Sequence, residues 1–107
     1  MLYLRMSFDS ENAGDLRERT SKEHREYIAS FLQQRDGVTV VQGGPMLADD
    51  GGDHILGSFL VVEAASHAEV QAFHDNDPFT RAGLFSRYDV VRWDRHIGNS
   101  SEEVYVP

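Results

Sequence analysis

The order of two hydrophobic periods along the chain constrains its fold more than any other feature of the sequence. Apolar residues alternate with other side chains over residues 2–8, which is the period of a strand. Apolar residues three and four apart follow, as on one face of a helix, and short β-branched and apolar runs come next. We place strands at 2–8, 38–42, 55–63 and 88–95, and helices at about 21–35 and directly after Ser66.

This order, β-α-β-β-α-β, predicts one α+β domain of ferredoxin-like type. In that fold a four-stranded antiparallel sheet carries both helices on one face. We expect the other face to carry Tyr3, Arg5 and β-branched neighbours. A half-apolar sheet face requires a partner, and a symmetric pairing of two sheets is the simplest solution. We therefore expect a homodimer formed through the sheet face.

Turn and capping residues set the expected ends of these elements. Thr20 and Glu23 have the spacing of a capping box at the start of the first helix, and Gly37 suits its C-terminal end. The polar residues 9–19 before this helix are expected to form a loop. The Gly-, Pro- and Asp-rich residues 43–53 are expected to form another.

The composition excludes several classes of protein. The chain has 107 residues, which suits one domain, here placed at 1–96 with a C-terminal tail at 97–107. It has no cysteine, so disulfides and cysteine-based metal or redox sites are excluded, and a reducing, cytoplasmic location is expected. A formal net charge of -8 disfavours a nucleic-acid partner, which requires basic patches.

Motifs for membranes, cofactors and metals are also missing from the sequence. There is no apolar run of about 18 residues and no signal-peptide pattern, so we expect no membrane partner. Neither a glycine-rich nucleotide-binding motif nor a metal-binding spacing of histidines or carboxylates is present. We therefore expect no cofactor and no metal.

His24 is the first candidate for chemistry. It precedes Tyr27, Ile28 and Phe31 by three, four and seven residues, so it shares their helix face and points toward the sheet. The N-terminus of a helix disfavours a cationic imidazole, and a neutral imidazole is a competent general base. The alternative is a half-buried histidine that only makes a hydrogen bond to a neighbour.

Asp77 is the second candidate. Asp77 and Pro78 form a common start of a helical turn, with Asp as the N-cap and Pro as the first helical residue. A carboxylate held by backbone amides is rigid and ionised, so it could also orient an imidazole and stabilise the imidazolium. The alternative is that Asp77 is a cap and nothing more.

Two further segments could contribute to a site. Gly57 and Ser58 interrupt an apolar strand, and Ser58 could offer its hydroxyl to a ligand or to His24, or else make a bond within the sheet. The segment Gly43-Gly44-Pro45-Met46 could form the wall of a small apolar pocket, or else a tight turn.

Taken together, these segments resemble the YciI-like (YCII-related) family over residues 1 to about 95. The segments that carry the resemblance are MLYLRMSF at the N-terminus, His24 before Tyr27, GGPM at 43–46, Gly57-Ser58, and DPF at 77–79 with Ala82-Gly83. The resemblance implies a dimeric ferredoxin-like fold akin to muconolactone isomerases. It also implies an active site built from a His–Asp pair, which falls on His24 and Asp77 with Ser58 nearby.

One characterised member of this family dehydrochlorinates a chlorinated hydroxyquinol. The chain departs from the plainest members in a longer acidic loop at 47–54 and in the tail at 97–107. Because both could alter the substrate or the dimer contact, that activity is not carried over as a specific expectation.

The leading hypothesis is a cofactor-free lyase or isomerase. His24 would abstract a proton from a small cyclic or aromatic substrate, and Asp77 would orient it. Residues expected to contact the substrate are Arg5, Gly44, Pro45, Met46 and Phe79. One alternative is a non-catalytic dimeric module that binds a ligand or serves another protein. Another is a haem-degrading or cofactor-independent monooxygenase whose site would be lined by Phe59 and Trp93.

Overall fold

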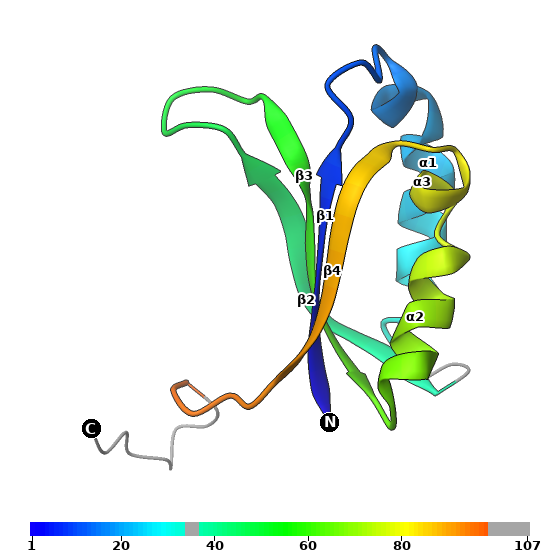
Figure 1. The fold of residues 1–107 in the computed structure, drawn as a ribbon, viewed down its shortest axis with the longest axis vertical. Coiled ribbons are helices and arrows are strands. Elements are labelled where there is room, and N and C mark those ends of the chain that lie inside the picture. Colours follow the sequence, from blue (N-terminus) through cyan, green and yellow to red (C-terminus); the bar gives the residue numbers. More distant parts are fainter. Residues whose placement is uncertain (34–36, 99–107) are drawn as a thin grey trace.

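A sheet with helices packed on one side forms the fold (Figure 1). The computed structural model describes residues 1–33 and 37–98. Its strands are β1 (Leu2–Asp9), β2 (Val38–Leu47), β3 (Ile55–Ala64) and β4 (Phe85–Trp93). Its helices are α1 (Leu16–Ala29), α2 (His67–Asp75) and the short α3 (Pro78–Arg81).

The strands form one sheet in the order β2-β3-β1-β4, and each neighbouring pair is antiparallel. All three helices lie on the same side of this sheet (Figure 1). This topology confirms the predicted α+β ferredoxin-like fold with a four-stranded antiparallel sheet. Within the described residues, no helix is long and apolar enough to cross a membrane.

The prediction of which sheet face the helices cover is wrong. Tyr3 and Arg5 are buried beneath the helices, at 3% and 0% exposure, rather than on the uncovered face. Arg5 can be buried there because its guanidinium forms an ion pair with Asp77, which lies just before α3. The opposite side of β1 therefore points away from the helices.

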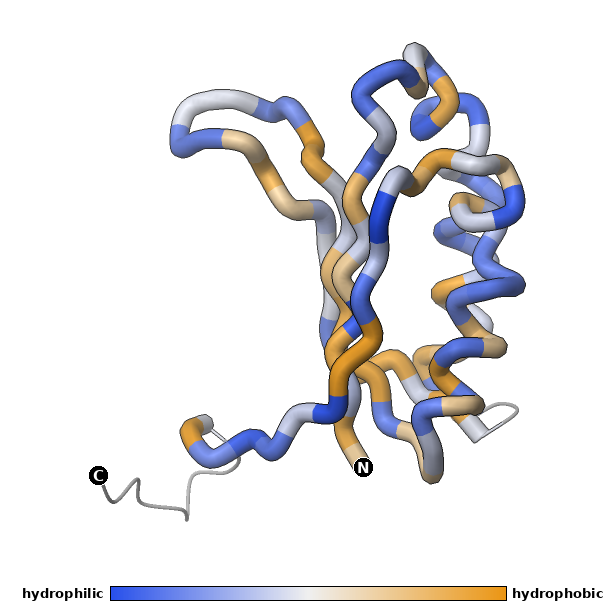
Figure 2. The backbone as a smooth tube through the Cα atoms, viewed as in Figure 1, coloured by the Kyte–Doolittle hydropathy of each residue, from blue (hydrophilic) through white to orange (hydrophobic). Residues whose placement is uncertain are grey.

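The uncovered side of the sheet, here called the open face, is apolar along its centre. Residues directly opposite one another in a sheet share a face, and the register pairs Leu4 with Val61 and Val91. The apolar residues of the open face are Leu2, Leu4, Met6, Phe8, Phe59, Val61, Val91 and Trp93. Figure 2 shows hydrophobic segments along the sheet, whereas α1 is hydrophilic over most of its length.

The hydrophobic core fills the space between the other side of the sheet and the helices. Phe73 of α2 packs edge-on against Phe31, with ring centroids 4.9 Å apart. Tyr27 of α1 donates its hydroxyl to the carbonyl oxygen of Phe73 at 2.8 Å, which ties the two helices together. The buried residues of this core are Tyr3, Phe31, Val38, Val40, Leu60, Val62, Ala64, Val70 and Phe73.

Helix α1 begins and ends earlier than predicted. It starts at Leu16 rather than near Thr20, so the capping-box interpretation and the loop over 9–19 are wrong for residues 16–19. The first helical turn is made of Leu, Arg and Glu, which favour helices even without an apolar stripe. The helix ends at Ala29, and the Ser30 hydroxyl donates to the Tyr27 carbonyl oxygen at 2.6 Å.

Strand β2 is longer than predicted, because the segment 43–46 continues it instead of forming a loop. The pairing shifts between Val40 and Gln42, as at a β-bulge, and then runs on to Leu47. Pro45 is tolerated because β2 is an edge strand, where a missing N–H need not break a ladder. The backbone of β1 approaches Gly57 closely, since a Cβ there would collide with the Ser7 carbonyl oxygen.

The second half of the chain follows the prediction closely. Ser66 caps α2 by accepting from the Glu69 amide at 3.3 Å, and α2 buries Val70, Phe73 and His74. The last strand starts at Phe85, three residues earlier than predicted. The division into a domain over 1–96 and a tail stays a prediction, and residues 99–107 of that tail lie outside the described residues.

Candidate active site

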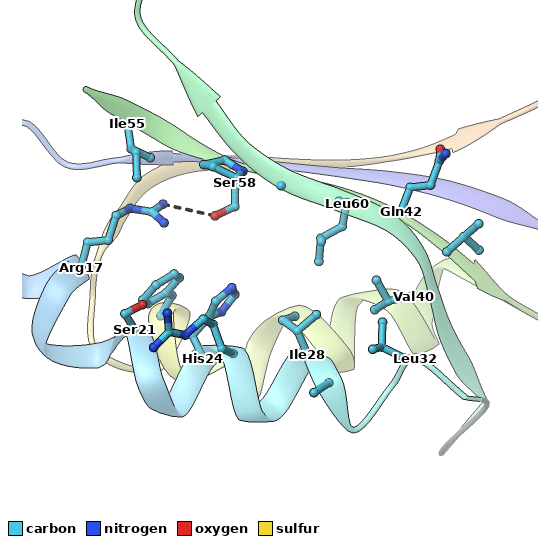
Figure 3. Close-up of a pocket in the computed structure, with 17 residues that line it drawn as sticks. Arg17, Ser21, His24, Ile28, Leu32, Val40, Gln42, Ile55, Ser58 and Leu60 are labelled. Carbon is cyan, nitrogen blue, oxygen red and sulfur yellow. Dashed lines mark hydrogen bonds between the residues drawn. The ribbon is translucent and has the colours of Figure 1, made fainter. Parts of the chain in front are cut away.

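A cavity of about 600 Å³ lies between α1 and the strands β2 and β3 (Figure 3). No side chain of α1 is fully buried, and part of the space between this helix and the sheet is cavity rather than core. One stripe of α1 lines this cavity, because residues three and four apart share a helix face. Polar groups occupy one end, namely Arg17, Ser21, His24 and Ser58. Apolar groups occupy the other end, namely Ile28, Leu32 and Val40.

His24 and Asp77 form a hydrogen-bonded pair at the polar end. The distance from His24 Nδ1 to Asp77 Oδ1 is 2.7 Å. An ionised carboxylate only accepts, so His24 Nδ1 carries a proton, and in the neutral ring the lone pair is then on Nε2. The His24 ring stacks on Phe79 at 3.8 Å between centroids, which fixes the plane of the imidazole. His24 thus has the geometry of an oriented base at the wall of a cavity.

Asp77 is fully buried and accepts three hydrogen bonds. Besides the bond from His24, its Oδ1 accepts from the Phe79 amide at 2.9 Å, as expected of a helix cap. Its Oδ2 accepts from Arg5 Nη1 at 2.9 Å. Burial acts to raise the pKa of the Asp77 carboxyl, but the bond from His24 and the charge of Arg5 outweigh it and hold the pKa below its ordinary value. Asp77 is therefore both the cap and an ionised partner of the imidazole.

A fixed cation stands beside the same end of the cavity. Arg17 donates from Nε and Nη2 to the two carboxylate oxygens of Asp9, at 2.6 and 2.8 Å. Its Nη2 also donates to the Ser58 hydroxyl at 3.2 Å, and its guanidinium lies 4.7 Å from the centre of the Phe79 ring. Figure 3 shows this contact, with Ser58 on the sheet side of the cavity and His24 on the helix side. Such a cation, held by two hydrogen bonds, can stabilise an anionic ligand.

The model of the YCII-related domain family matches residues 1–94. The chain belongs to this family. The resemblance found in the sequence is thereby confirmed. Among curated protein sequences, we found no match to this YCII-related chain.

Solved structures include a similar enzyme. It is 5-chloro-2-hydroxyhydroquinone dehydrochlorinase (TftG) from Burkholderia phenoliruptrix AC1100, in complex with 2,5-dihydroxybenzoquinone. It is 35% identical in sequence, with a TM-score of 0.77, and the match covers 88% of this chain and 94% of that chain. A 30S ribosomal protein from Thermotoga maritima matches at a TM-score of 0.46 and 14% identity over 86% of each chain, which is too distant to inform the site.

Of the eight residues expected at the site of this YCII-related protein, six lie in the wall of the cavity or directly behind it. His24, Ser58, Gly44, Pro45 and Phe79 line the cavity. Asp77 lies directly behind His24 and is bonded to it. Ser58 is brought to the same end, where its hydroxyl meets Arg17.

Arg5 and Met46, which were expected to contact the substrate, do not line the cavity. Arg5 is fully buried behind Asp77, as its ion pair requires. Met46 lies opposite Gly57, which in turn lies opposite Phe8, so it shares the open face with Phe8. Its side chain therefore points to the other side of the sheet.

Arg17 and Asp9 are the residues that the sequence interpretation missed. Both lie in the segment 9–19, which was predicted to be a loop. In the structure Asp9 is the last residue of β1, and residues 16–19 belong to α1. The available signal was an acidic residue at the end of a strand followed eight residues later by an arginine. Within residues 1–33 and 37–98, no group of three or more His, Cys, Asp or Glu side chains could hold a metal ion.

Proposed function

We propose that this protein is a cofactor-free enzyme of lyase or isomerase type, in which His24 removes a proton from a hydroxylated aromatic or similar cyclic substrate. The observation that carries this proposal is the 2.7 Å contact between His24 Nδ1 and Asp77 Oδ1 at the wall of the cavity. The similarity to a dehydrochlorinase of 5-chloro-2-hydroxyhydroquinone supports a hydroxylated aromatic as the substrate class.

His24 would act through its outer nitrogen. Because Nδ1–H donates to Asp77, the lone pair on Nε2 is available to accept a proton from a substrate O–H or C–H bond. The imidazolium that forms is stabilised by the ionised carboxylate of Asp77. The stacking of the ring on Phe79 keeps it in place during this transfer.

Arg17 and Ser58 would hold the negative charge that the lost proton leaves on a substrate oxygen. Ser58 accepts a hydrogen bond from Arg17, so its own O–H remains free to donate to the substrate. Arg17 is held in place by Asp9, so the donors need no rearrangement when the charge develops.

The fate of the substrate electron pair then decides between two reactions. If the ring carries chlorine, His24 first returns the proton to the carbon that bears the chlorine and then takes up a second O–H proton. The electron pair of that O–H bond forms a C=O bond as the carbon–chlorine bond breaks and chloride leaves, so the net change is loss of HCl. If there is no leaving group, His24 returns the proton to another carbon and the product is an isomer. Neither reaction requires an oxidant or a reductant.

The size of the cavity favours a substrate larger than one ring. A volume of about 600 Å³ falls in the range of pockets that bind drug-sized ligands. A ring held by Arg17 and Ser58 would occupy the polar end only. The apolar end would then hold a hydrophobic substituent, beside Ile28 and Leu32.

We also propose that the protein forms a homodimer through the open face. None of the described helices covers this face, and Val91 at its centre is 43% exposed. A contiguous apolar surface of this kind is typical of an interface, and two-fold pairing buries it on both chains. The second function considered, a dimeric ligand-binding module, shares this surface and differs only in lacking turnover. A cytoplasmic location remains a prediction.

Chloride release from 5-chloro-2-hydroxyhydroquinone, and from chlorinated hydroquinones with an added alkyl group, would test the enzyme proposal. We expect the wild type to release chloride, and we expect His24→Ala and Asp77→Asn each to reduce kcat/KM by about a hundredfold or more. His67→Ala is the matched control, because His67 is exposed and contacts the Val90 carbonyl oxygen away from the cavity. Full activity in both site variants would rule out the base, and binding without turnover would favour the ligand-binding module.

A further inference from the structure

Arg5 is a buried charge that the proposed reaction does not use. It lies in the centre of β1 with 0% of its surface exposed. Its guanidinium carbon is 5.7 Å from the ring centres of both Phe73 and Phe85, so it is enclosed by aromatic faces. Its Nε and Nη2 have no hydrogen-bond partner among the described residues. A charge buried at such cost requires an explanation beyond packing.

The contacts of Arg5 lead directly to the His24–Asp77 pair. Arg5 Nη1 donates to Asp77 Oδ2 at 2.9 Å, while Asp77 Oδ1 receives His24. Each oxygen of the Asp77 carboxylate is thus held by a different side chain. A carboxylate fixed at both oxygens cannot turn away from the imidazole when the imidazole gains or loses its proton.

His74 completes this cluster as a neutral acceptor. Its Nδ1 lies 3.3 Å from Arg5 Nη1, and a guanidinium only donates, so Nδ1 must be unprotonated. Burial, together with the nearby charge of Arg5, lowers the pKa of His74 to about 4. His74 therefore supports the Arg5 side chain without competing with it for Asp77. Burial also lowers the pKa of Arg5, against the opposing effect of Asp77.

We propose that Arg5 is a positioning residue of the active site, which holds Asp77 ionised and aimed at His24. This inference rests on the proposed function, because it assigns Arg5 a role in the same proton transfer. The charged and titratable groups around the cluster come from every element packed against it. They are His24, Arg17 and Tyr27 of α1, His74 and Asp75 of α2, Asp77 itself before α3, and Tyr88 of β4, whose ring stacks on that of His74.

The state of the Asp77 carboxyl tests this role without any substrate. Its carboxyl carbon would be followed by ¹³C NMR against pH in the wild type, Arg5→Gln and Arg19→Gln. Glutamine can still donate to Oδ2 but carries no charge, so we expect Arg5→Gln to raise the pKa of Asp77 by about one unit or more. Arg19→Gln is the matched control, because Arg19 is exposed and pairs with Asp15, away from the cluster. An unchanged titration of Asp77 in Arg5→Gln would overturn the proposal.

If Arg5→Gln fails to fold, the pKa of Asp77 in the His24→Ala variant tests the proposal instead. This variant leaves Arg5 in place and removes the other side chain that donates to Asp77. We expect the pKa of the Asp77 carboxyl to stay below its ordinary value of 3.8 in this variant. A pKa above that value would mean that His24 alone holds the carboxylate ionised, and the proposal would fail.

Steady-state kinetics distinguish a positioning role of Arg5 from a merely structural one. Arg5 does not touch the cavity, so Arg5→Gln should lower kcat by about tenfold or more and leave KM unchanged. Arg5→Lys keeps the charge and should restore most of kcat. A rise in KM at constant kcat, or no recovery in Arg5→Lys, would contradict the assignment. If the wild type turns over none of the chlorinated hydroquinones, the proposed function fails while the titration of Asp77 still decides the role of Arg5.

Discussion

Arg17 of α1 and Asp9 at the end of β1 form a two-point ion pair, with Nε–Oδ2 and Nη2–Oδ1 distances of 2.6 and 2.8 Å. The pair joins the first strand to the first helical turn and holds the guanidinium against Ser58. Because both side chains are largely buried, the orientation of the cation is set before any ligand arrives. The guanidinium is therefore fixed in orientation, unlike that of an exposed surface ion pair, as the proposed role in holding a negative charge requires.

Asp9→Asn is expected to reduce kcat/KM by about tenfold to a hundredfold, because Arg17 would lose one charged partner and its fixed orientation. The change is nearly isosteric, so the fold should persist. The measurement is chloride release from 5-chloro-2-hydroxyhydroquinone under steady-state conditions. Asp15→Asn is the matched control, since Asp15 forms an exposed ion pair with Arg19. Equal losses in the two variants would contradict a role for Asp9 in the site.

The stability of the fold should depend on pH through His74. Its pKa is lowered from 6.5 to about 4 by burial and by Arg5, so the unfolded chain takes up the proton first. The contribution of His74 to the free energy of unfolding is then fully present above pH 6.5. It is lost as the pH falls from 6.5 toward 4, and the loss is at most about 3 kcal/mol. The lowered pKa of Asp77 acts in the same direction but only at lower pH.

Urea unfolding at several pH values between 4 and 7 would measure this effect. His74→Gln should flatten the dependence, because glutamine does not titrate and its side-chain oxygen can still accept from Arg5. His67→Gln should retain the dependence, since His67 lies exposed at the start of the same helix. A wild-type free energy of unfolding that stays constant from pH 7 to 4.5 would contradict the prediction.

The topology was predictable because its main elements each carry a local signal in the sequence. Alternation in β1 and the cap at Ser66 are local signals, and the structure contains the elements they indicate. The start of α1 was not predictable in this way, because residues 17–19 are all charged and their helix is held by Arg17 meeting Asp9. That contact becomes visible only once β1 and α1 are packed side by side.

The burial of Arg5 shows why one half of the site could not be predicted. Alternation in β1 divides the strand into two faces but does not say which one the helices cover. Apolarity favoured the side of Leu4, whereas the helices cover the side of Arg5. The compensating charge, Asp77, lies 72 residues away in sequence. His24 and Asp77 could be named from local patterns, but their contact depends on the same long-range packing.

Val91→Glu is expected to break the homodimer into single chains. Val91 is 43% exposed in one chain, so the charge is tolerated there, but it would be buried without a partner between two open faces. Sedimentation velocity at micromolar concentration should give the mass of two chains for the wild type and of one chain for the variant. Leu32→Glu is the control, because Leu32 is 59% exposed on the helix side and should leave the mass unchanged. A wild type that sediments as one chain would exclude the dimer.

Ile28→Ala is expected to reduce the preference for substrates with an apolar substituent. Ile28 lines the apolar end of the cavity, away from the donors of Arg17 and Ser58. Removing its side chain takes away contact with the substituent but not with the ring. The measurement is the ratio of kcat/KM for an alkyl-substituted chlorinated hydroquinone to that for the unsubstituted one. This ratio should fall by about tenfold or more, as for other apolar pockets that lose a few methyl groups. Equal losses for the two substrates would mean that the ring itself extends to Ile28, and a substituent pocket at that end would be excluded.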